Sequence, residues 1–158
     1  MANAEAPLLY GAITTGYRGA GLLFVPAAGR RAMIYEIEFG QTGGLSSSDC
    51  QVQWDVSRCI TTTATGTSVA PNLLDIADPA VTTVFLNNLS AEPTATTAGN
   101  GLSLKNWGIN QRGSYRWRAL DDGDNLIIPN TSSAAVEMRA LSVSFVGSAV
   151  GSVSFIER

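Results

Sequence analysis

Apolar and polar side chains alternate with a period of two along much of this chain, and this alternation constrains its fold more than any other feature. It is clearest between residues 50 and 57, where Val52, Trp54 and Val56 are separated by polar residues, and it recurs between residues 33 and 39. Successive side chains of a β-strand point to opposite faces of the sheet, so the pattern predicts strands with one buried face. No window predicts an amphipathic helix of about ten residues or more, although one helical turn would fit residues 73–77.

Further short strands are predicted where apolar or β-branched runs end at Gly, Pro, Asn or Asp. They cover residues 22–25, 81–86, 114–118, 126–128, 137–145 and 153–155, with weaker candidates at 8–14 and 102–109. The small, polar stretches 61–68 and 94–101 are expected to be long loops. The sequence therefore predicts an all-β fold, an antiparallel β-sandwich of jelly-roll-like type with about eight to ten short strands.

The length of 158 residues fits one domain of ordinary size. Residues 1–20, with Pro7 and several glycines, are expected to form an extended N-terminal arm that lies on a neighbouring molecule. Residues 21–158 are then a single β-sandwich domain. The chain has no apolar run of about 18 residues and no basic segment followed by an apolar core, so we expect neither a membrane span nor an ordinary signal peptide.

Charge is sparse and dominated by arginine on the positive side. Only 15% of the residues are charged, the net charge is −3, and Lys105 is the one lysine among ten basic residues. A weakly charged surface suits contact with neighbouring subunits, and arginine is the better interface cation, although a bland surface and a coding bias explain the same composition. The negative charge argues against a protein that grips phosphate backbones, so nucleic acid is not an expected partner.

The sequence contains no histidine. This removes the Ser-His-Asp and Cys-His catalytic arrangements, the commonest general base near neutral pH, and most zinc sites. We therefore expect no enzyme activity, no catalytic residue and no cofactor. Cys50 and Cys59 are nine residues apart, which would place them on opposite faces of one strand, and we expect two reduced thiols.

Two acidic groups deserve a test as chemical sites. Glu36 and Glu38 would lie about 7 Å apart on one strand face, a separation found in glycosidases, but solvated charges are the expected role. Residues 121–125 hold three aspartates around a glycine. Their pattern predicts a turn, because Asp-Gly between two strands is typical of one and the twelve-residue calcium-loop spacing is missing. A weak cation site at Asp122 and Asp124 is the alternative.

One segment combines aromatic and basic residues and is the candidate interface. Its members are Trp107, Arg112, Tyr115, Arg116, Trp117 and Arg118. Tyr115 and Trp117 would share one strand face, with Arg116 and Arg118 on the other. The arginines could pair with carboxylates of a neighbouring subunit, face solvent, or neutralise phosphates beside stacked bases. The acidic total charge favours the first interpretation.

A family resemblance rests on the order of several segments: residues 32–40, 50–58, 70–75, 114–118 and 127–129, followed by the alternating C-terminal strands. In this arrangement the chain resembles the small decoration or cement proteins of tailed-bacteriophage heads. The resemblance implies a β-sandwich or jelly roll that forms a homotrimer on the outer surface of the capsid. It implies binding to the major capsid protein at junctions between capsomers, and a role in bracing the shell. Such a protein is made in the cytoplasm of the bacterial host and resides on the virion.

Other functions remain open at this point. The chain could be a different virion component, such as a coat, tail or fibre-tip receptor-binding protein. It could also be a lectin-like carbohydrate-binding sandwich, for which Trp107 beside the acidic residues 121–124 is the only indication in the sequence.

Overall fold

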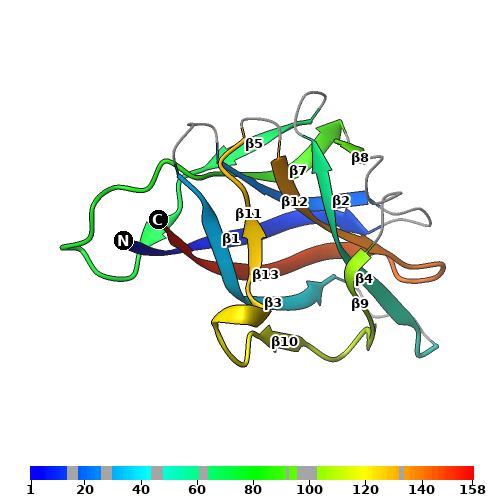
Figure 1. Cartoon of the computed structure of the whole chain (residues 1–158). Helices are drawn as coiled ribbons and strands as arrows, with labels where there is room; N and C mark the ends of the chain where they lie inside the picture. The colour runs from blue at the N-terminus through cyan, green and yellow to red at the C-terminus, as the bar shows by residue number, and fades with distance from the viewer. Residues whose placement is uncertain are drawn as a thin grey trace.

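The computed structural model describes residues 1–13, 18–25, 30–43, 48–60, 64–91, 93–95, 103–131 and 134–158. These residues form two sheets in which every strand pairs antiparallel with its neighbours (Figure 1), and these ranges contain no α-helix. The expectation of an all-β, antiparallel sandwich is confirmed. Within the same ranges, no helix is long and apolar enough to cross a membrane.

Sheet A has the strand order β10-β3-β13-β1-β6, and β11 pairs with β3 next to β10. Its strands are β1 (Ala2–Ile13), β3 (Ala32–Thr42), β6 (Asn72–Leu73), β10 (Tyr115–Arg118), β11 (Leu126–Ile128) and β13 (Gly147–Glu157). The long strands β1, β13 and β3 form its centre. Because β1 and β13 pair along almost their whole length, the two termini meet at one end of the molecule (Figure 1).

Sheet B has the order β5-β7-β2-β12-β4-β8, with β9 also paired to β4. Its strands are β2 (Arg18–Phe24), β4 (Gln51–Ile60), β5 (Thr65–Val69), β7 (Val84–Ala91), β8 (Thr94–Ala95), β9 (Ser103–Asn110) and β12 (Ala134–Leu141). The connection from β9 to β10 crosses from sheet B to sheet A. As a result β9 pairs with β4 in sheet B, and β10 pairs with β3 in sheet A.

The inner faces of the two sheets share one hydrophobic core. Phe39 and Phe155 of sheet A pack in the same cluster as Trp54 and Phe85 of sheet B, and all four side chains are fully buried. The alternation in β4 explains this directly, because Val52, Trp54 and Val56 all point into the core as predicted. A smaller apolar cluster around Leu22, Cys59, Leu89 and Ala135 lies on the other face of sheet B.

The expectation of an N-terminal arm over residues 1–20 is wrong for the residues described. Residues 2–13 form β1, which is paired to β13 of the same chain and to β6 at Ala4 and Glu5. Ala4, Ala6 and Leu8 are buried in the core, so this strand belongs to the domain itself. The small alanines made the alternation easy to miss, because their hydrophobic signal is weak. Residues 14–17 lie outside the described residues.

Other local expectations also changed. In the segment 73–77, Leu73 ends strand β6 and residues 74–77 form bends and a hydrogen-bonded turn rather than a turn of helix, with the Asp78 amide donating to the Asp75 carbonyl. The expected loop 61–68 contains the start of edge strand β5, and the expected loop 94–101 contains β8, with residues 61–63 and 96–101 outside the described part. Cys50 and Cys59 are free thiols, as expected, and pack in different clusters.

Candidate interaction surface

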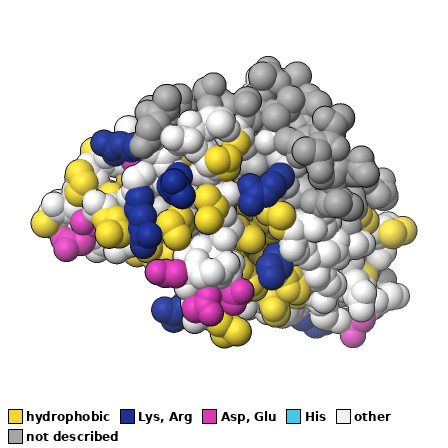
Figure 2. Space-filling view, in the orientation of Figure 1, with side chains coloured by type: hydrophobic (Ala, Val, Ile, Leu, Met, Phe, Trp, Pro, Cys, Tyr) yellow, Lys and Arg dark blue, Asp and Glu magenta, His cyan; other side chains and the backbone are white. Residues whose placement is uncertain are grey.

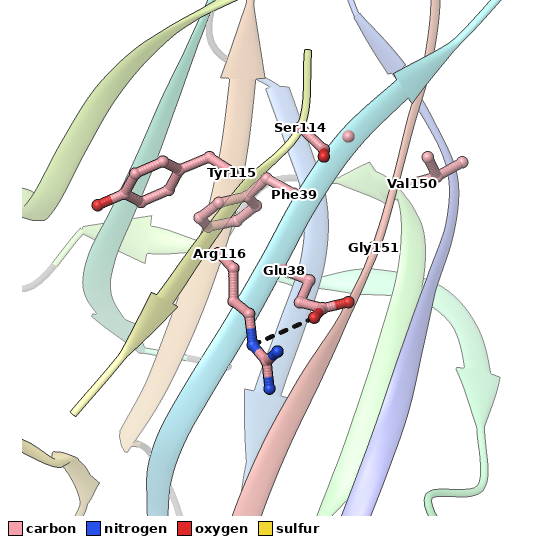
Figure 3. Close-up of a pocket in the computed structure, with 8 residues that line it drawn as sticks. Glu38, Phe39, Ser114, Tyr115, Arg116, Val150 and Gly151 are labelled. Carbon is pink, nitrogen blue, oxygen red and sulfur yellow. Dashed lines mark ion pairs between the residues drawn. The ribbon is translucent and has the colours of Figure 1, made fainter. Parts of the chain in front are cut away.

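The arginines of β10 pair with glutamates of the neighbouring strand β3. The strand register sets Arg116 opposite Glu38 and Arg118 opposite Glu36. The Arg116 guanidinium donates to both Glu36 carboxylate oxygens at 2.7 Å, and it contacts Glu38 at 3.3 Å, the ion pair drawn in Figure 3. Arg118 is more loosely placed, 3.7 Å from Glu36. The hydrogen bonds that Arg116 donates to Glu36 raise the pKa of Arg116 above its ordinary value.

This Arg–Glu ladder, formed by Arg116 and Arg118 with Glu36 and Glu38, bears on two expectations from the sequence. The arginines of β10 pair with Glu36 and Glu38 of their own chain, whereas their expected pairing with carboxylates of a neighbouring subunit stays a prediction. Glu36 was expected to be solvated, yet its side chain is only 13% exposed beneath Arg116. Strand pairing explains both, because a single sequence does not reveal that β10 lies next to β3. The pair of glutamates is thus occupied in binding arginine.

Arg112 also has a partner within the chain. Arg112 lies in the turn between β9 and β10, and its Nε donates at 3.0 Å to Asp49, which lies just before β4. This hydrogen bond lowers the pKa of Asp49 below its usual range. Both side chains are more than half exposed, so the pair is a surface contact of small energetic weight.

The candidate aromatic residues divide between core and surface. Trp117 is buried and carries the Lys105 ammonium 5.5 Å from its ring centre, whereas Tyr115 is 39% exposed. Trp107 links Tyr115 to the core, because its ring centre lies 5.2 Å from Tyr115 and 5.3 Å from Phe39. The expected division of faces is therefore found, with Trp117 inward and Arg116 outward. The rings close the sandwich edge beside β9 and β10.

A shallow hollow of about 420 Å³ lies over the outer face of β3, β10 and β13 (Figure 3). Gly40 and Gly151 lack side chains at its base, and Ser114, Val150 and the Glu38–Arg116 pair stand around it. Gly151 is required by close packing, since a Cβ there would collide with the Glu38 carbonyl of β3. The carboxylate on its rim, Glu38, is paired with Arg116.

The acidic residues 121–125 form a turn. Asp122–Asp124 is one 3₁₀ turn, and Asp121 caps it by accepting a 2.7 Å hydrogen bond from the Gly123 amide. In the described part of the chain, no group of three or more acidic or cysteine residues is arranged to hold a metal ion. Asp122 and Asp124 are therefore residues of a surface turn in this structure.

Large aliphatic side chains are exposed on three connections, a feature that sequence reasoning missed. Ile76 is 97% exposed beside Leu74 at 54%, and Leu120 is 93% exposed. Val143 and Val146 are each 82% exposed on the β12–β13 turn. Leu74, Ile76 and Leu120 lie in turn segments, and this position is the signal that could have revealed them. Val143 falls in the strand expected over residues 137–145, but β12 ends at Leu141 and residues 142–146 form the turn.

Hydrogen bonds hold the connections that carry these aliphatic residues. The Leu74 amide donates to the Asn3 carbonyl at 3.0 Å, and the Ala77 amide donates to Asp75 at 2.9 Å. In the β12–β13 turn, Ser142 donates to the Gln51 carbonyl and accepts from the Phe145 amide. The exposed side chains are therefore presented on fixed backbone rather than on free ends.

Glu157 anchors the segment between β6 and β7 to the end of β13. Its buried carboxylate accepts hydrogen bonds from the amide and hydroxyl of Thr83 at 2.7 and 2.6 Å, from Thr82, and from Arg30 at 2.6 Å. Burial would raise the pKa of Glu157, but the bonds from Thr83, Arg30 and the Thr82 amide outweigh it and lower the pKa. Sequence reasoning gave no sign of this anchor.

A second buried charge cluster lies on the outer face of sheet B. Asp55 of β4 and Glu137 of β12 are buried, and both contact the Arg139 guanidinium, with Asp55 in a close ion pair and Glu137 at 3.9 Å. Arg139 stands opposite Asp55 in the strand register. The cluster thus links the neighbouring strands β4 and β12 of sheet B, which is a structural role.

Comparison of the chain with models of protein families, with curated proteins and with solved structures finds no match. Its function is therefore inferred from its own residues and fold.

Proposed function

We propose that this chain is a structural virion protein, a decoration or cement protein that binds the outer surface of a tailed-phage capsid as a homotrimer and stabilises the shell. The major capsid protein is its principal partner. The proposal requires no catalytic centre and no cofactor, in keeping with a sequence that lacks histidine.

The strand order supports a jelly roll as the specific form of the sandwich. With β10 and β11 counted as one strand, and β5 to β8 as an insertion, eight strands remain. In chain order, one sheet reads sixth, third, eighth, first, and the other reads fifth, fourth, seventh, second. Two Greek keys wound together give this order, and jelly rolls of this kind are common in viral capsid proteins and lectins.

The observation that carries the proposal is the set of exposed aliphatic side chains on fixed turns. Ile76 and Leu120 are almost fully exposed, as are Val143 and Val146. Isolated surface leucines are ordinary. Pairs of aliphatic residues that are held in solvent by hydrogen-bonded turns indicate a surface that is buried against a partner. A chain with 15% charged residues has few charges that such a contact would have to desolvate.

These side chains lie at opposite ends of the sandwich. Strand pairing puts Asn3, which holds the Leu74 loop, opposite Ile156, while the β12–β13 turn leads into Gly147 at the other end of β13. In Figure 1 the β6–β7 segment and the β12–β13 turn project from opposite ends. One molecule can therefore contact two neighbours at once, about 30 Å apart, which a protein that bridges capsomers must do.

The face seen in Figure 2 agrees with a role in protein contacts. Hydrophobic side chains and charged side chains of both signs are interspersed there, without a broad basic field. A surface of this kind suits protein partners better than a nucleic-acid backbone.

Sedimentation with shells assembled from the major capsid protein of the same phage tests the proposal. The purified chain is expected to bind those shells, and pair variants Leu74→Ser/Ile76→Ser and Val143→Ser/Val146→Ser are expected to lower occupancy, with at least one pair lowering it by roughly tenfold. Thr67→Ser, on exposed edge strand β5, is the matched control and should bind like the parent. The proposal fails if the folded parent does not bind, or if both pair variants bind as well as it does.

A further inference from the structure

A second hollow lies on the outer face of sheet A, at the end where the chain begins. Its volume is about 410 Å³, which is within the range of small-ligand sites. Asn3 of β1, Tyr35 of β3, Ile156 of β13 and residues of the β10–β11 connection line it. Of the Arg–Glu ladder, only Arg118 lines this second hollow. The proposed capsid role does not explain why these separate elements meet here.

The connection that forms one wall is fixed in place. The Ala119 amide donates to the Tyr35 carbonyl at 2.8 Å, so the connection starts bonded to the strand beneath it. The Asp121 cap and the 3.1 Å bond from the Asp124 amide to the Asp121 carbonyl fix its middle. After Asn125, β11 pairs again with β3. The hollow is therefore preformed, which reduces the entropy cost of binding a ligand.

Polar groups that line the hollow are available to a ligand. In the described part of the chain, the side chains of Asn3, Asp122 and Asn125 form no hydrogen bond with the protein, and neither does the Tyr35 hydroxyl. These groups supply two amides, a carboxylate and a phenol, so they can both donate and accept hydrogen bonds.

Arg118 adds a strong donor. Its side chain is 69% exposed and stands 3.7 Å from Glu36, whose two oxygens already accept 2.7 Å bonds from Arg116. The guanidinium of Arg118 is thus weakly engaged and can turn toward a ligand. Carboxylate and guanidinium groups each form two parallel hydrogen bonds to suitably spaced partners.

The charges around the hollow select against ions. Asp121 and Asp122 would repel a phosphate, sulfate or carboxylate, while Arg118 would repel an ammonium group. An uncharged ligand with many hydroxyl groups faces neither penalty. It can bond to all of these side chains without leaving a buried charge unpaired.

An apolar wall completes the site. Leu120 is 93% exposed at the rim, and Tyr35 and Ile156 contribute further apolar surface. A sugar ring presents C–H groups on one face and hydroxyl groups around its edge, which matches this division. We infer that the hollow binds a neutral saccharide unit.

Two-dimensional amide NMR with sugars as probes tests the inference. Titration with glucose, galactose, mannose and N-acetylglucosamine, each as free sugar and as methyl glycoside, is expected to shift the amides of Tyr35, Asn125 and Ile156 for at least one sugar. A dissociation constant of about 1 mM is expected for so open a site. Binding of the methyl glycoside indicates the terminal unit of a larger glycan, and binding of the free sugar alone indicates a monosaccharide.

Matched variants separate a specific site from weak surface contact. Asp122→Asn and Arg118→Gln should weaken binding by roughly tenfold, whereas Asp124→Asn, with the same charge change in the same turn but outside the hollow, should not. The inference would be overturned if no sugar shifts the amide signals, or if all three variants lose sugar binding equally. It would also be overturned if inorganic phosphate or methylammonium, and not sugars, shifts these signals. The shell-binding result is independent, since none of these residues belongs to the tested aliphatic pairs.

Discussion

At the scale of single residues, the buried Glu157 carboxylate is the clearest case of one side chain that organises a larger segment. It replaces its lost water with bonds from Arg30, Thr82 and Thr83, and so it ties the loop that carries Leu74 and Ile76 to the end of β13. Its folded pKa lies below the ordinary value of 4.5. The stability that it contributes is therefore complete above about pH 4.5 and is lost as pH falls through the lower, folded pKa.

Glu157→Gln tests this role. The variant should lower the free energy of unfolding at pH 7 by about 2–3 kcal/mol, because charged hydrogen bonds are lost from a buried site. The difference from the parent should shrink in acid, where the parent carboxylate is also neutral. Urea unfolding at pH 7 and at pH 3 measures both effects. Glu38→Gln, at an exposed position, should cost under about 1 kcal/mol, and equal losses in the two variants would contradict the assignment.

The Arg–Glu ladder shows, also at residue scale, why the candidate interface could be predicted only in part. The alternation of Tyr115 and Trp117 with Arg116 was readable from sequence, and the structure confirms that Trp117 faces inward. The partners of the arginines were not readable, because Glu36 is distant in sequence and meets Arg116 only through strand pairing. Tyr35 and Asn125 of the second hollow were missed for the same reason.

At the scale of elements, prediction succeeded where strands bury one full face of large residues. β3, β4, β10, β11 and β13 follow from alternation and turn residues. Most of β5 falls in the expected loop 61–68, because its sequence TGTSV has one large apolar residue, Val69, and four of its five residues are exposed on a sheet edge. β1 falls in the expected arm, with only a weak strand candidate at residues 8–14, because Ala2, Ala4 and Ala6 give little hydrophobic contrast although they are buried.

The close approach of β3 and β13 gives a prediction about elements. Gly151→Ala should destabilise the fold by about 1–3 kcal/mol or more, because the added methyl group meets the Glu38 carbonyl. Gly40→Ala, at the base of the same hollow, should be nearly neutral, since its nearest neighbour is Val150 at 3.5 Å. Thermal unfolding of both variants is the measurement. A Gly151→Ala protein as stable as Gly40→Ala would show that the two strands are not packed as described.

At the scale of the whole molecule, the sandwich is a stiff block with aliphatic side chains held out at both ends. Its long strand β13 is paired with β1 on one side and β3 on the other along almost its whole length, and its two sheets share one core. Such a block transmits force between the neighbours that its ends contact. The proposed role as a cement protein is thus a property of the molecule as a whole and depends on no single side chain.

Genome context offers a simple check at this scale. Genes for the terminase, portal and major capsid protein of a tailed phage are expected beside the gene for this chain. Neighbours that encode only cellular metabolic enzymes would contradict a virion role.

The rupture temperature of capsid shells tests the central claim most directly. Emptied shells that lack this protein would be heated with and without the purified chain, and release of soluble capsid subunits would be followed by light scattering. Saturating protein is expected to raise the rupture temperature, because a ligand that binds only the intact shell stabilises it by mass action. Shells that rupture at the same temperature with and without the bound chain would contradict the account.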